Sequence, residues 1–242
     1  MTKKIDRHDL KKDEFATDVA KIYGYASDNP TRILVWVIIV LVVAGGAIGY
    51  YSYNKRNKKD AKYKLSLVYT MMDAGQYNEA LDTVKVIMGK YNGTQAGDIA
   101  KYLFAHLNYA FGYLDSSITA YEDYLAIEHP DSDLAPAALM GIATCYEDKS
   151  RYTDAIKYYT QILDKYPNFF HNDEVMLSIG RCYDVSGDFA NAIKYYQDFF
   201  AKFPESPFQQ RAIVLLSRAK ARAYASISPQ IPTNIKPQKS EG

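Results

Sequence analysis

An uninterrupted apolar segment stands near the start of the 242-residue chain. No charged residue lies between Arg32 and Lys55, and the stretch from Ile33 to Tyr50 has 11 Ile, Leu or Val among its 18 residues. Side chains of these types favour insertion into a bilayer by about 3 to 7 kcal/mol in total. Trp36 near one end and three tyrosines near the other would place aromatic rings at both membrane interfaces. We therefore predict a transmembrane helix over residues 32–54.

A cleaved signal peptide is the alternative interpretation of this segment, since Gly45 and Ala47 resemble a cleavage site. The apolar run exceeds the ~7 to 15 residues of a signal-peptide core, and 32 residues precede it, which favours a permanent span. Gly45 and Gly49 also form a GxxxG pair, the spacing at which two membrane helices approach closely. Apolar spans often contain such pairs by chance, and packing of these glycines against another membrane helix is the alternative hypothesis.

The two ends of the chain differ from its middle in composition. Residues 1–31 are rich in charge, and Phe15, Val19, Ile22 and Ala26 recur at helical spacing, which predicts a short amphipathic helix before the span. Residues 227–242 contain three prolines and no periodic apolar pattern, so we predict a disordered tail there.

A repeat of about four units fills the region between the span and the tail. The pentapeptide AIKYY occurs at residues 155–159 and again at residues 192–196, 37 residues later. When Ala155 and Ala192 are aligned with Ala80 and Ser117 as anchor positions, the spacings are 37, 38 and 37 residues. Mostly small residues stand twelve before each anchor, large ones three before it, and mostly aromatic ones four after it. In this order they are Val68, Ala105, Ala143 and Gly180; Tyr77, Leu114, Tyr152 and Phe189; Val84, Tyr121, Tyr159 and Tyr196.

Each unit carries the turn signals of two antiparallel helices. A residue suited to a helix end stands before each anchor, and a second turn closes each unit. These residues are Gly75, Gly112, Ser150 and Gly187, then Asn92-Gly93, Pro130, Pro167 and Pro204. Small residues that face each other allow the paired helix axes to approach to ~8 to 10 Å. One pair cannot bury its apolar stripe alone, so we expect an all-α solenoid that a helix from Pro207 to about Ala225 caps.

This pattern resembles the tetratricopeptide (TPR) repeat over residues 62–206, strongly in the third and fourth units and least in the second, where Ser117 and Leu114 depart from it. The resemblance implies a TPR domain over residues 55–226 whose groove is lined by the first helix of each unit. The implied groove positions are Leu65, Tyr69 and Met72; Tyr102, His106 and Tyr109; Met140, Thr144 and Glu147; Leu177, Arg181 and Asp184.

The implied groove is apolar and aromatic with a polar minority. It lacks the Lys and Asn residues with which chaperone-binding TPR domains clamp a C-terminal carboxylate. We therefore expect it to bind an extended hydrophobic peptide or a helix of another protein, with Tyr102 and Tyr109 as aromatic anchors on one helix face. The alternative is that much of this stripe contacts neighbouring repeats or the N-terminal segment.

Composition and motifs point away from other chemistry. The 29 basic and 28 acidic residues nearly cancel, so no whole-chain charge favours nucleic acid as a partner. Catalytic motifs are absent, and His106 and His171 have no metal ligands at suitable spacing, so we expect no enzymatic activity, no cofactor and no metal. Cys145 and Cys182 occupy equivalent positions in neighbouring units, and we expect them to pack in the core rather than form a disulfide.

The order of the parts carries a second resemblance. This order is similar to that of the bacterial YfgM-like family: a charged segment, then one span, then TPR units. The charged segment and the start of the span have the sequence DEFATDVAKIYGYASDNPTRILVWV. That resemblance implies an ancillary subunit of the Sec translocon in the inner membrane, with its repeats outside the cytoplasm beside a membrane-anchored chaperone. The KYP and KFP repeat endings are also similar to envelope TPR proteins of outer-membrane assembly and of the Tol-Pal system. The alternative is therefore a structural subunit of another envelope complex. Such a complex would be of the outer-membrane assembly type, of the Tol-Pal and division type, or of the motility type.

The charges that flank the span favour the opposite orientation. The C-terminal flank holds Lys55, Arg56, Lys58, Lys59, Lys62 and Lys64, whereas the N-terminal flank holds Lys21 and Arg32. The positive-inside rule, counted within ~20 residues of the span, would place the repeats in the cytoplasm. A cytoplasm-facing adaptor thus remains open beside the extracytoplasmic orientation that the resemblance implies.

Overall fold

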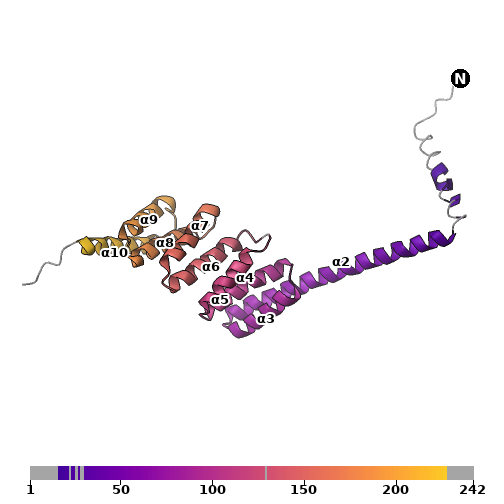
Figure 1. The fold of residues 1–242 in the computed structure, drawn as a ribbon. Coiled ribbons are helices and arrows are strands. Elements are labelled where there is room, and N and C mark those ends of the chain that lie inside the picture. Colours follow the sequence, from indigo (N-terminus) through magenta and orange to yellow (C-terminus); the bar gives the residue numbers. More distant parts are fainter. Residues whose placement is uncertain (1–15, 22, 25–26, 28–29, 129, 228–242) are drawn as a thin grey trace, which may run out of the picture. The chain divides into compact units, whose positions relative to one another are not determined.

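A computed structural model describes residues 16–21, 23–24, 27, 30–128 and 130–227, and within them the regular elements are helices, with no strand (Figure 1). The chain divides into two compact units after Asp60. The principal helices are α2 (Pro30–Asp73), α3 (Tyr77–Lys90), α4 (Gln95–Ala110), α5 (Leu114–Leu125), α6 (Leu134–Asp148), α7 (Tyr152–Lys165), α8 (Asn172–Ser186), α9 (Phe189–Lys202) and α10 (Gln209–Ile227). Of the apolar positions of the predicted amphipathic helix, Val19 lies within the described residues, whereas Phe15, Ile22 and Ala26 lie outside them, as does the tail after Ile227.

Helix α2 is longer than the sequence predicted. The span and the first helix of the repeats were expected as separate elements, over residues 32–54 and from about residue 62, but one helix of 44 residues includes both segments. The chain has neither glycine nor proline between Gly49 and Gly75, so nothing in this stretch interrupts the backbone hydrogen bonds of the helix. The residues after Asp60 belong to the second unit.

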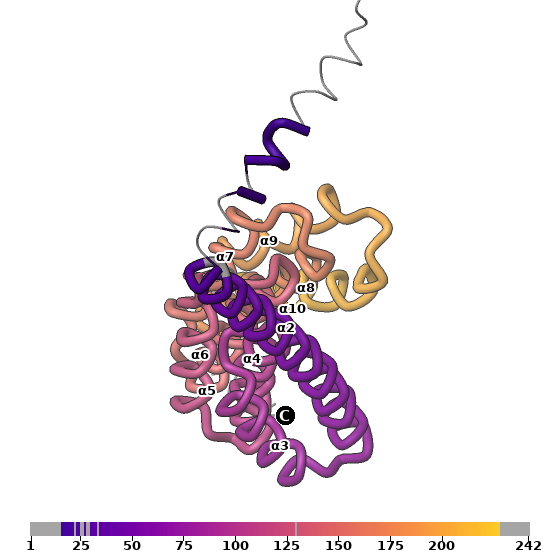
Figure 2. Tube along the Cα trace, turned by 90° about the vertical axis from the view of Figure 1, so that its right-hand side faces the viewer, coloured from indigo at the N-terminus to yellow at the C-terminus, as the bar shows by residue number. Residues whose placement is uncertain are grey.

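The second unit is built from helix pairs in the predicted register. From α3 to α10 each helix packs against the next along the chain, and α4 also contacts α6 while α8 contacts α10 (Figure 2). All four anchors, Ala80, Ser117, Ala155 and Ala192, have no exposed surface. The inner positions of the facing helices are buried as well, among them Val68, Ala105 and Ala143 at 0% exposure. The predicted all-helical TPR-like solenoid is therefore confirmed.

Serine at the second anchor fits because its hydroxyl has an acceptor. Ser117 Oγ donates a hydrogen bond of 2.9 Å to the carbonyl oxygen of Ala105, the small residue that faces it. Cys145 Sγ lies 3.5 Å from the same hydroxyl and donates to it. A buried hydroxyl that is fully hydrogen-bonded loses little by leaving water, so the second unit keeps the same helix spacing with serine in place of alanine.

The close approach of the Tyr196 ring to helix α8 explains the glycine at position 180 of the repeat pattern. A Cβ atom on Gly180 would lie 2.5 Å from Cε1 of Tyr196, the aromatic residue four after the last anchor. Glycine thus leaves the space that the tyrosine ring fills, and Tyr196 is 0% exposed. Cys145 and Cys182, predicted to pack in the core, are both buried and both free thiols, which confirms that prediction.

The four predicted turns between paired helices share one hydrogen-bond pattern. At Gly75, Gly112, Ser150 and Gly187 the backbone φ is positive, at 72°, 77°, 59° and 88°. The residue that follows each turn donates to a carbonyl five residues earlier, as in Arg151 N to Tyr146 O at 2.8 Å, which is the Schellman arrangement at a helix end. Ser150 is the non-glycine residue that holds this left-handed conformation within the described chain.

Replacing Ser150 by glycine is expected to stabilise the protein. A left-handed φ costs a residue with a side chain about 1 to 2 kcal/mol, and the greater freedom of glycine in the unfolded chain offsets about 0.5 to 1 kcal/mol of the gain. Ser150→Gly should therefore raise the free energy of unfolding by about 0.5 to 1 kcal/mol. Urea unfolding followed by circular dichroism measures this change. Ser116→Gly, at an exposed helical position in α5, is the control and should lower stability instead; equal effects of both changes would contradict the strain at Ser150.

Enlarging an anchor residue is expected to destabilise the protein. Ala155 is 0% exposed and lies in the same core cluster as Ala143 of the facing helix. Ala155→Leu would overpack this contact and should cost about 1 to 3 kcal/mol, measured as a lower urea midpoint. Ala201→Leu on the exposed side of α9 is the matched control and should leave the midpoint unchanged. An unchanged midpoint for Ala155→Leu would mean that the helices are not in this register.

Candidate functional site

The candidate site is the row of side chains that the first helix of each pair directs to one side of the repeat domain. These helices are the end of α2, then α4, α6, α8 and finally α10. Three predicted groove residues do not lie on an accessible surface: Asp184 is 1% exposed, Leu65 is 8% exposed and Leu177 is 1% exposed. The two leucines pack into hydrophobic clusters with residues of neighbouring helices, such as Val84 for Leu65 and Tyr196 for Leu177. The prediction that these two leucines line the groove is therefore corrected, because the helix face that borders the groove also packs against the second helix of the pair.

The first half of the row is aromatic and apolar. Tyr69 is 45% exposed, His106 is exposed, and Met72 and Met140 are half-buried. Desolvation raises the pKa of Tyr69 and lowers the pKa of His106, so both side chains are neutral at pH 7. The surface formed by Tyr69, Met72, His106 and Met140 therefore offers uncharged side chains to a partner.

Tyr102 is a packing residue as much as a groove residue. Its ring lies 5.6 Å from that of Tyr121 and 5.8 Å from that of Tyr124, both on α5. Burial, with a smaller contribution from Tyr69, raises the pKa of Tyr102. Its removal would open space between helices, so Tyr102 is unsuitable as a pure test of binding.

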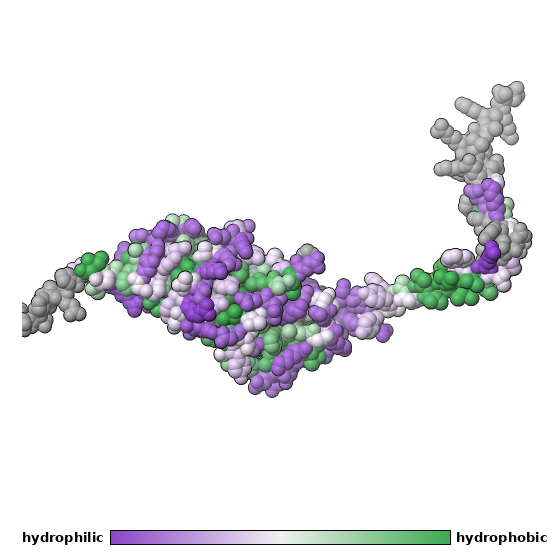
Figure 3. Space-filling model, viewed as in Figure 1, coloured by the Kyte–Doolittle hydropathy of each residue, from purple (hydrophilic) through white to green (hydrophobic). Residues whose placement is uncertain are grey.

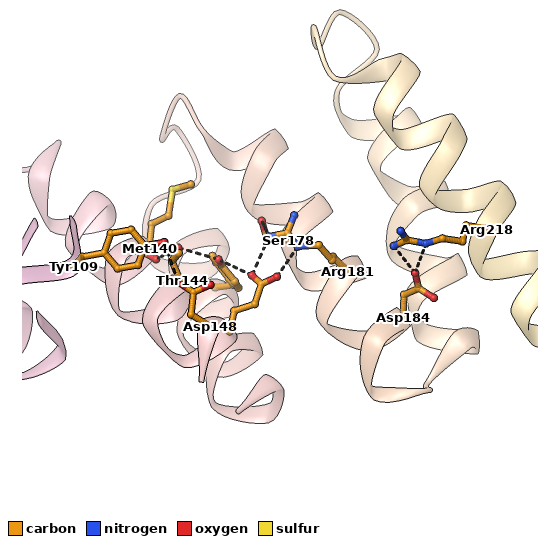
Figure 4. A network of polar contacts seen from close by, with 10 residues as sticks. Tyr109, Met140, Thr144, Asp148, Ser178, Arg181, Asp184 and Arg218 are labelled. Atoms are coloured by element: carbon orange, nitrogen blue, oxygen red, sulfur yellow. Dashed lines mark hydrogen bonds and ion pairs between the residues drawn. The ribbon is translucent and has the colours of Figure 1, made fainter. Parts of the chain in front are cut away.

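A hydrogen bond links the aromatic half of the row to the next helix. The Tyr109 hydroxyl donates to a carboxylate oxygen of Asp148 on α6 at 2.9 Å (Figure 4). Burial and this carboxylate raise the pKa of Tyr109 to about 12, which keeps the phenol protonated at physiological pH. Tyr109 thus connects α4 with α6, the first helices of two neighbouring pairs.

Charged residues dominate the second half of the row. Arg181 on α8 forms two hydrogen bonds with the Glu147 carboxylate on α6, of 2.5 Å from Nε and 2.9 Å from an Nη atom. The Tyr159 hydroxyl donates to the same carboxylate at 3.2 Å, and the guanidinium also reaches Ser178 Oγ at 3.1 Å. The charge-assisted bonds to Glu147 raise the pKa of Arg181, which stays fully charged. Thr144 Oγ1 lies 3.2 Å from the Tyr159 hydroxyl and completes this network (Figure 4).

The last link joins α8 to the terminal helix α10. The Asp184 side chain is 0% exposed and receives hydrogen bonds from Arg218 at 3.0 and 2.7 Å and from Arg222 at 3.1 Å. The two arginine side chains are about half exposed, at 45% and 48%. The buried carboxylate is thus held by two cations whose outer surfaces face solvent.

Together these contacts form a polar ladder, by which we mean Tyr109–Asp148, Glu147–Arg181 and Asp184–Arg218 with Arg222. The sequence predicted an apolar groove with a polar minority; the predicted positions on α4 and the end of α2 carry uncharged side chains, whereas Arg181 and Asp184 on α8 are charged. The resemblance to TPR repeats gave Glu147, Arg181 and Asp184 as groove positions but not their pairing, and it missed Arg218 and Arg222. A signal for the pairing exists, since Glu147 to Arg181 and Asp184 to Arg218 are both 34 residues apart.

Metal ligands do not gather in this site. Among the described residues no group of three or more His, Cys, Asp or Glu side chains is placed to hold a metal ion. The acidic residues of the ladder are instead paired with arginines and a tyrosine. The arrangement offers a binding surface with fixed hydrogen-bonding groups.

Known structures with the same fold are TPR proteins. A TPR protein from Parabacteroides merdae is 15% identical with a TM-score of 0.56, and the alignment covers 69% of this chain and 63% of that one. The MamA protein is 21% identical with a TM-score of 0.51, covering 62% and 77%. The apo form of RapI is 11% identical with a TM-score of 0.60, covering 70% and 53%. No curated protein matches the sequence.

The family itself is shown by its sequence profile, which matches residues 25–217 and thus most of the chain. TPR repeats are in general non-catalytic scaffolds for protein–protein interaction, in agreement with a paired-helix surface of fixed polar and aromatic groups. The chain belongs to the tetratricopeptide repeat-like domain family.

Proposed function

We propose that the protein is a membrane-tethered TPR scaffold that binds a segment of another protein in its groove. The observation that carries this proposal is the apolar part of α2. Within the described residues α2 is the one helix long and apolar enough to cross a membrane, and none of its apolar segment is buried. Figure 3 draws this segment as a continuous apolar stretch. An apolar surface of this size is unfavourable in water and favourable in a bilayer, which supports tethering.

The groove supports a partner with both apolar and polar contacts. Tyr69, Met72 and His106 give an uncharged surface, and the polar ladder gives arginine donors beyond it. An extended peptide or an amphipathic helix with apolar side chains toward α2 and α4 would match this order. A Cβ atom at Gly45 or Gly49 would meet no other helix of the described chain within 4 Å, so this flat helix surface is free to contact another membrane helix.

The proposed setting is the protein translocation machinery of the bacterial inner membrane, with the repeats outside the cytoplasm. The order of parts that resembles the YfgM-like family supports this accessory role, in which the partners are the Sec translocon and a membrane-anchored chaperone. A second candidate is a cytoplasm-facing TPR adaptor, which the six cations from Lys55 to Lys64 favour. The two candidates differ in the side of the membrane that the repeats occupy.

Cysteine labelling distinguishes these orientations. Cys145 and Cys182 are both 0% exposed, and burial raises the pKa of the Cys182 thiol to about 12, so the native protein gives a low background. Gln197→Cys adds an exposed thiol on α9. We expect a membrane-impermeant maleimide to label this variant in intact spheroplasts. Labelling that needs lysis would place the repeats in the cytoplasm and exclude the extracytoplasmic role.

Photo-crosslinking in native membranes tests the groove and its partner. A crosslinking amino acid at Tyr69, which is exposed and makes no ring contact in the described chain, should capture a specific partner. The same amino acid at Lys157, on the opposite side of a helix pair, is the control. Tyr69→Ser with His106→Ser should lower capture from a third groove position, Met140, without changing helix content. Capture of translocon subunits supports the proposed setting, and capture of a different envelope complex would replace it.

A further inference from the structure

Helix α10 occupies the place of the first helix of a fifth unit. Arg218 follows Arg181 by 37 residues, and Ser217 follows Gly180 by the same interval, which is the repeat length. One side of α10 packs inward through Ala212, Leu215 and Ala219, which are 0%, 7% and 0% exposed. In every earlier unit a second helix then covers the other side of the first helix. Within the described residues α10 is the last helix, and no second helix covers it there.

The side of α10 that would receive this second helix is open and apolar. Ile213 is 46% exposed, whereas its counterpart Met176 is 2% exposed under α9. Ser217 is exposed, whereas its counterpart Gly180 is buried against Tyr196. Farther along the helix Tyr224 is 75% and Ile227 is 81% exposed. Residues 213, 217, 220, 224 and 227 are spaced by four, three, four and three, so they share one face, which we call the open face of α10.

Lys220 gives this open face a charge that the earlier units lack. The corresponding residues of α6 and α8 are Tyr146 and Tyr183, whose rings each lie 5.5 Å from a tyrosine of the covering helix, Tyr158 and Tyr195. The sequence of α10 contains no acidic residue. Among the residues that the structure describes, no ion pair involves Lys220. A helix that covers this face therefore contacts the Lys220 cation at the position where two tyrosine rings contact each other in the earlier units.

We propose that the open face of α10 binds an acidic amphipathic helix of a partner protein. This helix carries a small residue against Ser217, a carboxylate three residues later against Lys220, and an aromatic side chain one residue after that. The first and third features copy what α7 and α9 present to α6 and α8, and the carboxylate complements the lysine. A second copy of α10 is disfavoured, because two antiparallel α10 helices would bring their lysines and arginines together. This surface is separate from the groove, so its test is independent of the proposed function.

A helix-stapled peptide tests the docking surface on the full chain in detergent micelles. The probe is the sequence of α7, Tyr152–Lys165, with Tyr158→Glu, and its control carries Tyr158→Lys. Fluorescence anisotropy should show that the Glu peptide binds about tenfold more tightly than the Lys peptide, because opposite charges attract across the contact and like charges repel. Lys220→Glu in the protein should reverse this preference. Lys157→Glu in the protein, on the exposed side of its α7, is the control and should leave the preference for the Glu peptide unchanged.

A bulky side chain placed on the open face of α10 provides the second test of binding. Ser217→Arg should abolish binding of the Glu peptide, and because the residue is exposed the urea midpoint should stay that of the parent. If that variant loses stability, Ile213→Ser provides the same test by removing an exposed apolar contact. The proposal is overturned if neither peptide binds, if Ser217→Arg binds normally, or if Lys220→Glu leaves the preference unchanged. A dimer of the parent chain that Ser217→Arg dissociates would overturn it in favour of a second copy.

Discussion

Replacing both Arg218 and Arg222 by methionine is expected to lower the free energy of unfolding by about 3 to 5 kcal/mol, as removal of one side of a buried ion pair does. The reason is the position of Asp184, whose side chain is 0% exposed and whose three described hydrogen bonds all come from these two arginines. Without them a carboxylate would stay in the protein interior with no cation, and methionine fills a similar volume without supplying a charge. Urea unfolding of the full chain followed by circular dichroism measures the loss.

A third substitution separates the unpaired charge from the loss of side-chain packing. Adding Asp184→Leu to the double variant removes the buried carboxylate and should restore most of the lost stability, because a well-packed apolar residue often replaces a buried ion pair at little cost. Arg211→Met with Lys220→Met, on the exposed surface of the same helix, is the control and should change stability by less than about 0.5 kcal/mol. A double variant that unfolds like the control would show that α10 is not held to α8 through Asp184.

Above pH 10 the repeat domain is expected to lose stability steeply and to unfold cooperatively before pH 12. Burial raises the pKa of Tyr121, Tyr159 and Tyr196 from the ordinary value of 10.0, and raises that of Tyr124 to about 12. The folded state therefore keeps these protons to a higher pH than the unfolded state. Their stabilising effect is complete below pH 10 and is lost as pH rises from 10 toward the folded-state pKa. Each buried tyrosine contributes up to about 1.4 kcal/mol per pH unit in that interval.

Circular dichroism and phenolate absorbance, followed together during an alkaline titration, measure this transition. One step of the phenolate absorbance should coincide with the loss of helix, because the buried tyrosines ionise only when the helices separate. Tyr196→Phe is an informative variant, since the Tyr196 hydroxyl is buried without a hydrogen-bond partner in the described part of the chain. This change should cost little at pH 7 and should move the alkaline midpoint upward. Ionisation of all tyrosines without loss of helix would contradict the burial of these side chains.

The candidate site shows where sequence reasoning reaches its limit. The groove positions came from register, and Tyr69, Met72, His106 and Met140 do keep exposed or half-buried side chains. Register alone could not separate Leu65 and Leu177 from them, because a helix between two neighbours presents part of its groove edge to the core. Nor could it pair Glu147 with Arg181, since the contact depends on how far the superhelix brings one unit toward the next.

The sequence by itself determined the features that act over a few residues. The repeat interval, the small residues at the anchors and the turns at Gly75, Gly112 and Gly187 follow from local sterics and backbone φ, and they predicted the helix pairs. Only the tertiary structure decided the polar ladder, the burial of Asp184 and the open face of α10. These depend on which helices meet after stacking, and side chains 34 residues apart acquire a fixed distance only when the intervening helices are packed.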